Sequence, residues 1–392
     1  MKKLVSVIIP AYNHEKYIKD AINSVLNQTY KNIELIVEDD CSKDNTVKEI
    51  KKIKDKRLKT IFSKENKGPV RTMNHLLSMC KGDYIAILGS DDVWYPEKLE
   101  KQLEYFENKK VGAVFSMMDV IDENGNRSEE ADFFENTVFK KENKTKGKHI
   151  RTLFEQGNYL CHPSSIISRE AFEEIGYYNS AYKLLHDFDY WTRLLNKYEI
   201  YIVPEKLLGY RRSSAGDNLS SINENEIGIN NETYEIIKKL FETIKDDTLI
   251  EGFKDVFINK KSKTEKELLC EKIMILSKLK AQGSNNKFLA LSLLANNDDV
   301  NEILDLLEEK YNYSLKEFYK DNAKVMDFYS AALLINYKEG FEDLKKDREI
   351  LQKQISNLSA ELNGIYNSKS WKITRPLRKI MERIKKWKIQ RW

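Results

Sequence analysis

The stretch YIAILGSDDVWYPEKLEKQL, residues 84–103, ends an apolar run on two adjacent aspartates and continues into a helical pattern. Residues 84–89 carry no charge, which predicts a strand covered on both faces. Asp91 and Asp92 then follow at the carboxyl end of that strand. Because open α/β sheets bind ligands at this edge, the aspartate pair marks a candidate ligand site.

The first 118 residues alternate apolar runs with helical patterns such as residues 15–28. This alternation predicts an α/β fold in which helices flank a mostly parallel central sheet. The predicted strands are residues 4–10, 33–39, 58–63, 84–89 and 112–118. The polar residues 119–148 predict a variable hairpin or loop, after which apolar order resumes and completes the first domain near residue 220.

Beyond residue 220 strand signals fade and amphipathic helical segments dominate. We therefore predict three parts, namely an α/β domain over residues 1–220, a helical domain over 221–340, and a coiled-coil-like helix with a basic amphipathic tail over 341–392. The three-four spacing of apolar residues in 341–362 fits either a short coiled coil or a helix packed in its own bundle.

The composition suits a soluble globular protein of more than one domain, with 392 residues, 41% hydrophobic and 33% charged. Four cysteines without a CxxC pair argue against a disulfide scaffold or a structural zinc site, and a reducing cytoplasm is the simplest setting. The apolar run near the N-terminus is far shorter than the roughly 20 residues of a membrane span. We therefore expect a cytoplasmic protein.

The net charge of +4 comes from the tail, because residues 369–392 hold ten Lys and Arg against Glu382 alone. Trp and Ile interleaved with these charges predict an interfacial helix that contacts the inner face of the cell membrane. A solvated helix and a docking element for a partner protein are the alternatives. No nucleic-acid-binding fold is evident, so nucleic acid is not an expected partner.

Two adjacent carboxylates repel each other when they are desolvated. A divalent cation such as Mg²⁺ or Mn²⁺, bridging to phosphate oxygens, would relieve this repulsion. The alternative is a solvated turn and helix start, where aspartates are favourable. Two further polar segments, PAYN at 10–13 and EDDCSKDNT at 38–46, follow the first two strands at the same edge of the sheet. This convergence favours a ligand site.

Together, VSVIIPAYN, ELIVEDDCSKDNT and GDYIAILGSDDVW resemble the family 2 glycosyltransferases, which have the nucleotide-sugar-binding GT-A fold. The resemblance covers about residues 4–215, and its quoted motifs resemble those of bacterial enzymes that build cell-surface polysaccharides or glycosylate flagellin. It implies a donor site in the PAYN turn, with Pro10, Tyr12 and Asn13, where the tyrosine stacks on the nucleotide base. No GxxxxGK[ST] loop is present, which disfavours a P-loop enzyme.

The resemblance implies three further donor contacts. Asp40 would accept the uracil N–H, Asp91 would contact ribose or a phosphate-bound metal, and Asp92 would hold that metal. Arg71 lies two positions before the family's most frequent arginine, and we expect it either to contact the diphosphate or base or to lie on the surface. The implied cofactors are Mn²⁺ or Mg²⁺ with a UDP-sugar donor.

The resemblance also implies that Asp187, in LHDFDYW, is the catalytic base, with His186 in place of the family's glutamate. Ser213 stands where many relatives carry a histidine that completes the metal shell. Three side chains have two readings each. His186 either tunes or orients Asp187 or occupies an acceptor-facing position. His162 is either a core histidine or part of the acceptor site, and Trp191 is either core or acceptor-site wall.

We expect an inverting, metal-dependent hexosyltransferase that moves a sugar, N-acetylglucosamine or a related hexose, from a UDP-sugar. The expected acceptor is a hydroxyl on a cell-surface glycan, a lipid-linked saccharide or a surface protein such as flagellin. A catalytically silent nucleotide-binding scaffold and a nucleotidyltransferase are the alternatives. The C-terminal helices are candidates for homo-oligomer contacts.

Overall fold

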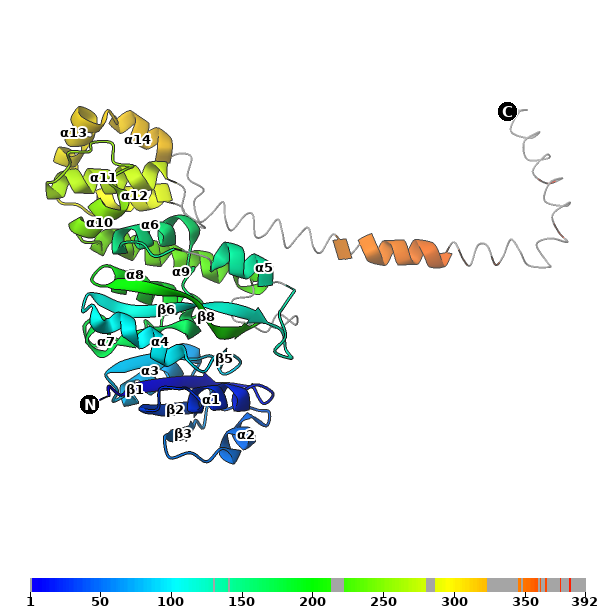
Figure 1. Cartoon of the computed structure of the whole chain (residues 1–392). Helices are drawn as coiled ribbons and strands as arrows, with labels where there is room; N and C mark the ends of the chain where they lie inside the picture. The colour runs from blue at the N-terminus through cyan, green and yellow to red at the C-terminus, as the bar shows by residue number, and fades with distance from the viewer. Residues whose placement is uncertain are drawn as a thin grey trace. The chain divides into compact units, whose positions relative to one another are not determined.

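The computed structural model describes residues 2–129, 131–139, 142–212, 222–279 and 286–322, together with 345–346, 348–358, 360, 364, 374 and 381. Two compact units divide the chain, Met1–Lys324 and Val325–Trp392 (Figure 1). The candidate site lies in the first unit, so the second is described only briefly.

An eight-stranded mixed sheet with the order β3-β2-β1-β4-β7-β6-β8-β5 forms the centre of the first unit. Neighbours pair in parallel in β3-β2-β1-β4 and in β6-β8, and antiparallel at β4-β7, β7-β6 and β8-β5. The strands are β1 (Val5–Ala11), β2 (Ile33–Asp39), β3 (Leu58–Phe62), β4 (Tyr84–Ile87), β5 (Val93–Trp94), β6 (Val111–Ile121), β7 (Ile166–Ser168) and β8 (Glu199–Arg211). The predicted α/β class with a mostly parallel sheet is confirmed.

Helices cover both faces of this sheet because successive strand residues point to opposite sides. Val7 and Ile9 pack with α1 (Ile18–Leu26), α2 (Thr46–Lys52) and α4 (Lys98–Leu103) on one face. Ile8 packs on the other face with helices from α3 onward. The helices first named on that face are α3 (Pro69–Met79), α6 (Lys146–Gln156), α7 (Arg169–Ile175) and α8 (His186–Leu195).

The segment predicted as a hairpin or loop, residues 119–148, contains more regular structure than its polarity suggested. β6 continues to Ile121, which forms a bridge with Arg127 across a tight turn. The short helical turns α5 (Ala131–Phe133) and η2 (Phe134–Val138) follow before α6. The Glu135 carboxylate holds this excursion by accepting the Val120 N–H and two bonds from the Arg127 guanidinium.

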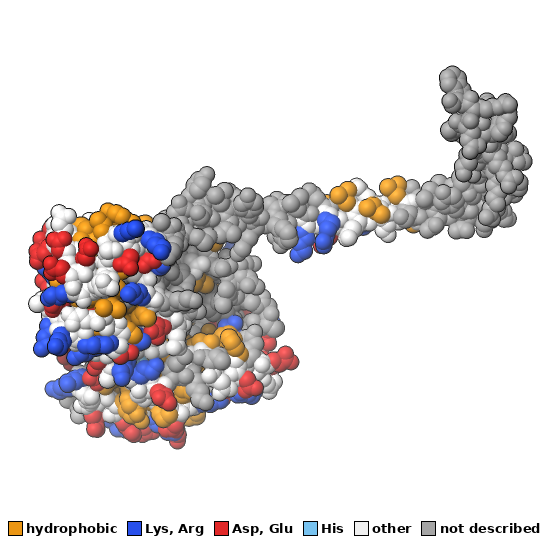
Figure 2. All heavy atoms as spheres, turned by 90° about the horizontal axis from the view of Figure 1, so that it is seen from above, with side chains coloured by type: hydrophobic (Ala, Val, Ile, Leu, Met, Phe, Trp, Pro, Cys, Tyr) orange, Lys and Arg blue, Asp and Glu red, His pale blue; other side chains and the backbone are white. Residues whose placement is uncertain are grey.

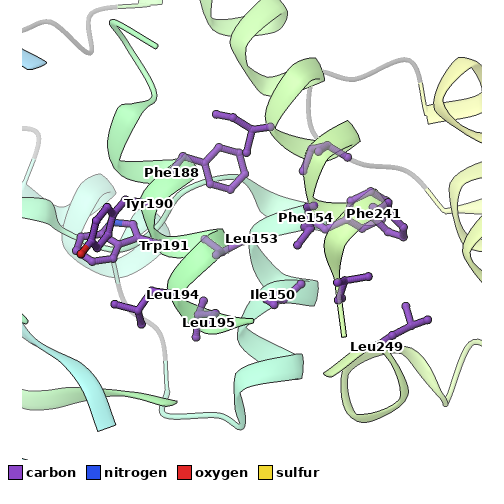
Figure 3. Packing of buried hydrophobic residues seen from close by; sticks show 14 of the residues in the cluster. Ile150, Leu153, Phe154, Phe188, Tyr190, Trp191, Leu194, Leu195, Phe241 and Leu249 are labelled. Carbon is purple, nitrogen blue, oxygen red and sulfur yellow. The ribbon is translucent and has the colours of Figure 1, made fainter. Parts of the chain in front are cut away.

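The later helices share the core of the sheet domain. Phe154 of α6 packs edge-to-face on Phe241 of α9, at a centroid distance of 5.1 Å, and α8 lies beside them (Figure 3). The helices of this region are α9 (Ile222–Thr243), α10 (Asp246–Phe253), α11 (Glu265–Lys278), α12 (Asn286–Ala295), α13 (Val300–Tyr311) and α14 (Leu315–Asn322). The compact unit runs through residue 324, while the predicted boundary at 220/221 stays a prediction.

In the second unit, residues 348–358 are helical. Leu351, Ile355 and Leu358, which fit the predicted three-four spacing, are all exposed, and Figure 2 shows apolar side chains along the described stretch. The predicted coiled coil stays a prediction. The basic tail lies outside the described residues except for Thr374 and Met381. None of the helices that the structure describes is long and apolar enough to cross a bilayer.

Candidate active site

Three loops meet at the carboxyl edge of β1, β2 and β4, as the sequence predicted. Asn13, with a left-handed φ of 53°, donates its N–H to Ser42 Oγ at 2.8 Å and accepts the Lys43 N–H at 2.9 Å. His14 Nδ1 lies 2.6 Å from Ser90 Oγ, directly before the aspartate pair. The turn after β1 therefore ties the other two loops together.

Asp40 links this edge to the loop that precedes α3. Its two carboxylate oxygens accept the N–H groups of Lys67 and Gly68, both at 2.8 Å. Each oxygen keeps a second lone pair that can accept a bond from a nucleobase. The side chain of Tyr12 is 39% exposed beside these loops. Arg71 lies exposed in the first turn of α3, and its guanidinium forms no ion pair within the described ranges.

Asp91 and Asp92 lie side by side against the backbone of Gly89. A Cβ on Gly89 would be 2.7 Å from Asp92 Oδ2 and 2.9 Å from Asp91 Oδ1. Asp92 is 2% exposed, and its burial together with the charge of Asp91 raises the pKa of its carboxyl well above the usual range. The pair therefore carries negative charge that the protein compensates incompletely.

Arg211, the last residue of β8, fixes this carboxylate pair from the other side. Its N–H donates to Asp92 Oδ1 at 2.8 Å, and its Nε donates to the carbonyl of Asp91 at 2.7 Å. The guanidinium carbon lies 4.6 Å from the ring centroid of Tyr17. Sequence reasoning placed Ser213 near the metal shell by resemblance but missed Arg211, because a bond donated by a backbone N–H leaves no pattern in the side chains.

The donor set suits a hard divalent cation. Asp92 Oδ2 and Asp91 Oδ1 are carboxylate oxygens of the kind that Mg²⁺ and Mn²⁺ prefer, and a cation would relieve the raised pKa of Asp92. Within the described ranges no group of three or more His, Cys, Asp and Glu is placed to hold a metal ion. Ser213, the position where relatives carry a histidine, lies outside these ranges. Water and substrate phosphate would have to fill the remaining positions.

Asp187 occupies the first turn of α8 and is only partly accessible. Its Oδ2 accepts a bond from Asn158 Nδ2 at 2.7 Å, and its Oδ1 accepts the Phe188 N–H at 2.8 Å. Burial raises the pKa of Asp187, and His186, the Phe188 N–H and the Asn158 amide oppose that shift. The carboxylate is thus held in place and is more basic than a solvated aspartate.

Cys161 connects the two acidic centres. Burial raises the pKa of its thiol, and the charges of both Asp92 and Asp187 raise it further. The segment around Cys161 contacts both: Asn158 Nδ2 donates to Asp187 Oδ2 at 2.7 Å, and the carbonyl of Pro163 accepts the Nε1–H of Trp94, two residues after Asp92, at 3.1 Å. Residues 158–163 therefore link two acidic segments that are 95 positions apart in the sequence.

His186, the neighbour of Asp187 in the sequence, lies among the rings of His162 and Tyr178. His162 Nε2 lies 2.8 Å from the Tyr178 hydroxyl, and burial, reinforced by His186, lowers the pKa of His162 well below its usual value. The ring centroids of His162 and His186 are 5.6 Å apart. Trp191 is fully buried and meets the ring of Phe115 edge-to-face at 4.8 Å. Trp191 is thus a core residue, whereas His162 is a half-buried, hydrogen-bonded histidine for which both readings stay open.

Comparison with known proteins assigns this site to a family. A profile for glycosyl transferase family 2 matches residues 6–176. An uncharacterised glycosyltransferase of Methanocaldococcus jannaschii is 35% identical over 232 residues, which cover 58% of this chain and 77% of that protein. The chain belongs to glycosyltransferase family 2.

Two other proteins place the family assignment in context. TuaG of Bacillus subtilis, whose name places it in teichuronic acid biosynthesis, is 39% identical over 127 residues, or 32% of this glycosyltransferase and 50% of TuaG. Staphylococcus aureus TarS, residues 1–349 in complex with UDP-GlcNAc, superposes with a TM-score of 0.51 at 20% identity, over 80% of this chain and 92% of that one. The latter likeness confirms the GT-A fold.

Two contacts of this glycosyltransferase site had no signal in the sequence. Asn158 binds Asp187 across 29 residues, and Glu232 of α9 binds the backbone just before Asp187 across more than 45. An Asn or a Glu in a polar segment is common, so the residue type alone does not predict a long-range contact. An alignment of covarying positions is the kind of signal that could have found these pairs.

Proposed function

We propose that this glycosyltransferase inverts the anomeric carbon as it moves a sugar from a UDP-sugar to an acceptor hydroxyl. The observation that carries the proposal is that residues 158–163 contact both the Asp187 carboxylate, through Asn158, and the segment that follows Asp92, through Pro163, which favours a metal and diphosphate site near a candidate base. A donor bound at the edge of the sheet would present its anomeric carbon between them.

The donor half of the site would work as follows. Tyr12 stacks on the base, and the free lone pairs of Asp40 accept the imide N–H of uracil. Arg71 and the first turn of α3 would face the diphosphate, where an exposed guanidinium favours anions. A divalent cation on Asp91 and Asp92 would act as a Lewis acid that holds the charge of the departing nucleoside diphosphate.

Asp187 would act as the general base. Its carboxylate takes the proton of the acceptor hydroxyl while that oxygen bonds to the anomeric carbon, and the bond from this carbon to the UDP oxygen breaks on the opposite face. Proton transfer of this kind contributes roughly 10² to 10⁴ in rate. The raised pKa of Asp187 supports this role, since a base near the operating pH accepts the proton more readily.

For the transferred sugar we propose N-acetylglucosamine or a related hexose, and for the acceptor a cell-surface glycan first, since the name of TuaG points to an envelope polymer. A lipid-linked saccharide and a surface protein such as flagellin are the next candidates. We propose that residues 1–220 carry the chemistry, that 221–340 support it, and that 341–392 contact the membrane surface or a second copy of the chain.

The test combines nucleotide binding with turnover. Thermal unfolding with UDP, dTDP, GDP and ADP, each with Mn²⁺ or with EDTA, should give a Mn²⁺-dependent stabilisation by UDP. A ligand at 100 times its dissociation constant stabilises by about 2.7 kcal/mol. Asp92→Ala should lose this response, whereas Asp187→Asn should keep it and lose sugar transfer.

Two outcomes would replace the proposal. Release of pyrophosphate in place of UDP would mark a nucleotidyltransferase. Wild-type biological activity in the Asp187→Asn protein would show that Asp187 is not a catalytic base and would favour a nucleotide-binding scaffold. Anomeric configuration of the product, read by NMR, tests inversion separately.

A further inference from the structure

The helical region reaches into the site through α9, which lies beyond the residues that the family profile matches. Residues 183–185, called the base loop here, lead directly into α8 and Asp187. The carboxylate of Glu232 on α9 accepts the N–H groups of all three loop residues. The distances are 2.9 Å from Lys183 N to Oε1, 2.9 Å from Leu184 N to Oε2, and 2.7 Å from Leu185 N to Oε2.

A second contact of α9 lies one helical turn earlier, on the same face. A Cβ on Gly228 would be only 2.9 Å from Leu184 Cδ1, so the absence of a side chain there lets α9 approach the base loop closely. Deeper in the core, α8 packs in the same cluster as α6 and α9, where Phe188, Leu153 and Phe241 are buried (Figure 3). The helix that carries Glu232 is thus fixed relative to α8.

Three consecutive N–H groups that converge on one carboxylate form an anion-binding concavity in the backbone. Bonds from N–H groups to a charged acceptor are stronger than neutral ones, so Glu232 largely decides the conformation of the base loop. The base loop in turn contacts the first turn of α8, which carries Asp187. The carbonyl of Lys183 lies 3.3 Å from His186 Nδ1, and the carbonyl of Leu185 accepts the Asp189 N–H at 3.1 Å.

We infer that Glu232 is a positioning residue, which holds the base loop so that Asp187 faces the acceptor hydroxyl. The helical region would then complete the active site instead of only supporting the fold. This inference rests on the proposed role of Asp187 as the base. None of the donor-site residues named above bonds to Glu232, so donor affinity should not depend on it.

The test compares Glu232→Gln with wild type in the full-length protein. Glutamine has the same shape, but its NH₂ group would face an N–H donor, so at least one bond to the base loop is lost. Misplacing a catalytic group by about 1 Å can cost about 100-fold in rate. We expect kcat for UDP release from a panel of UDP-sugars to fall about 10- to 100-fold, while the Kd for UDP stays within about twofold.

The matched control is Glu235→Gln, which removes the same charge from an exposed position on the same helix. It should leave kcat and Kd unchanged. A pH profile separates positioning from mere stability: in Glu232→Gln the acid limb of kcat should move to higher pH, because a displaced Asp187 loses part of its bond to Asn158. If Glu232→Gln fails to fold, Glu232→Asp, which keeps the charge, takes its place in the same assay.

Wild-type kcat and an unchanged pH profile in a folded Glu232→Gln protein would overturn the inference. The inference would also be overturned if kcat decreased only in proportion to the fraction of folded protein. Asp187→Asn distinguishes this failure from failure of the proposed function. If Asp187→Asn is inactive and Glu232→Gln is active, Asp187 is the base and Glu232 does not position it. If Asp187→Asn is active, or if the wild-type protein turns over no UDP-sugar, both proposals are wrong.

Discussion

Replacing Gly89 by alanine should displace the carboxylate pair while both aspartates stay in the sequence. The added Cβ would lie 2.7 Å from Asp92 Oδ2 and 2.9 Å from Asp91 Oδ1, whereas ordinary contact begins near 3.4 Å. Asp92 Oδ2 must therefore retreat by about 0.7 Å and Asp91 Oδ1 by about 0.5 Å, or the backbone must move by similar amounts. Metal–ligand distances tolerate roughly 0.2 Å, so both shifts exceed what a metal site can absorb.

The assay is thermal unfolding with UDP and a titration of Mn²⁺. We expect Gly89→Ala to fold, with a loss of about 1–3 kcal/mol from overpacking, and to lose the Mn²⁺-dependent part of the UDP response. Activity should fall by about 100-fold or more, since displacement of catalytic groups on this scale costs that much.

Gly112→Ala is the matched control. A Cβ there would meet Tyr198 Cβ at 2.6 Å, which is comparable crowding against a side chain that takes no part in the site. It should lose similar stability and keep the Mn²⁺-dependent response. A Gly89→Ala protein with wild-type affinity for Mn²⁺ and UDP would refute the placement of the metal at these two oxygens.

Substitutions at three further positions test single side chains. Asn158→Ala removes an amide that lowers the pKa of Asp187, so the pKa of this carboxyl should rise. The acid limb of the pH profile of kcat should then move to higher pH. An acid limb at the wild-type pH would contradict the assignment of Asp187 as the base. Asp92→Asn should raise the Tm of the metal-free protein at pH 7, because the raised native pKa of Asp92 means that ionisation costs stability. The difference in Tm between Asp92→Asn and wild type should grow as the pH rises above about 3.9, the usual pKa of an unfolded aspartate, and should vanish below it. A lower Tm for Asp92→Asn at pH 7 in EDTA would contradict this reasoning. Tyr12→Ala should weaken UDP binding in calorimetry by about 1–3 kcal/mol while Tyr12→Phe keeps it, and equal losses in both would argue against stacking.

Local patterns in the sequence were sufficient for the sheet and its helices. The apolar run at 33–39 is β2 at the same residues, the run at 4–10 is shifted by one residue from β1, and the run at 58–63 ends one residue beyond β3. The physical reason is that strands inside the sheet are buried on both faces, so that their segments are mostly apolar, whereas the edge strand β3 leaves Lys59 and Thr60 exposed. The two-residue strand β5, directly after Asp92, had no such signal because its partner in β8 lies more than a hundred residues away.

The sequence by itself also determined which strand ends carry polar groups, and hence the edge at which Tyr12, Asp40 and the aspartate pair meet. Parallel strands force their carboxyl ends to one edge, so local order along the chain is enough for that inference. Only the tertiary structure decided that Arg211 clamps the aspartate pair and that Glu232 clamps the base loop. Such contacts depend on how distant segments pack, and a hydrogen bond between residues 49 or 120 positions apart leaves no periodicity in the sequence for a reader to find.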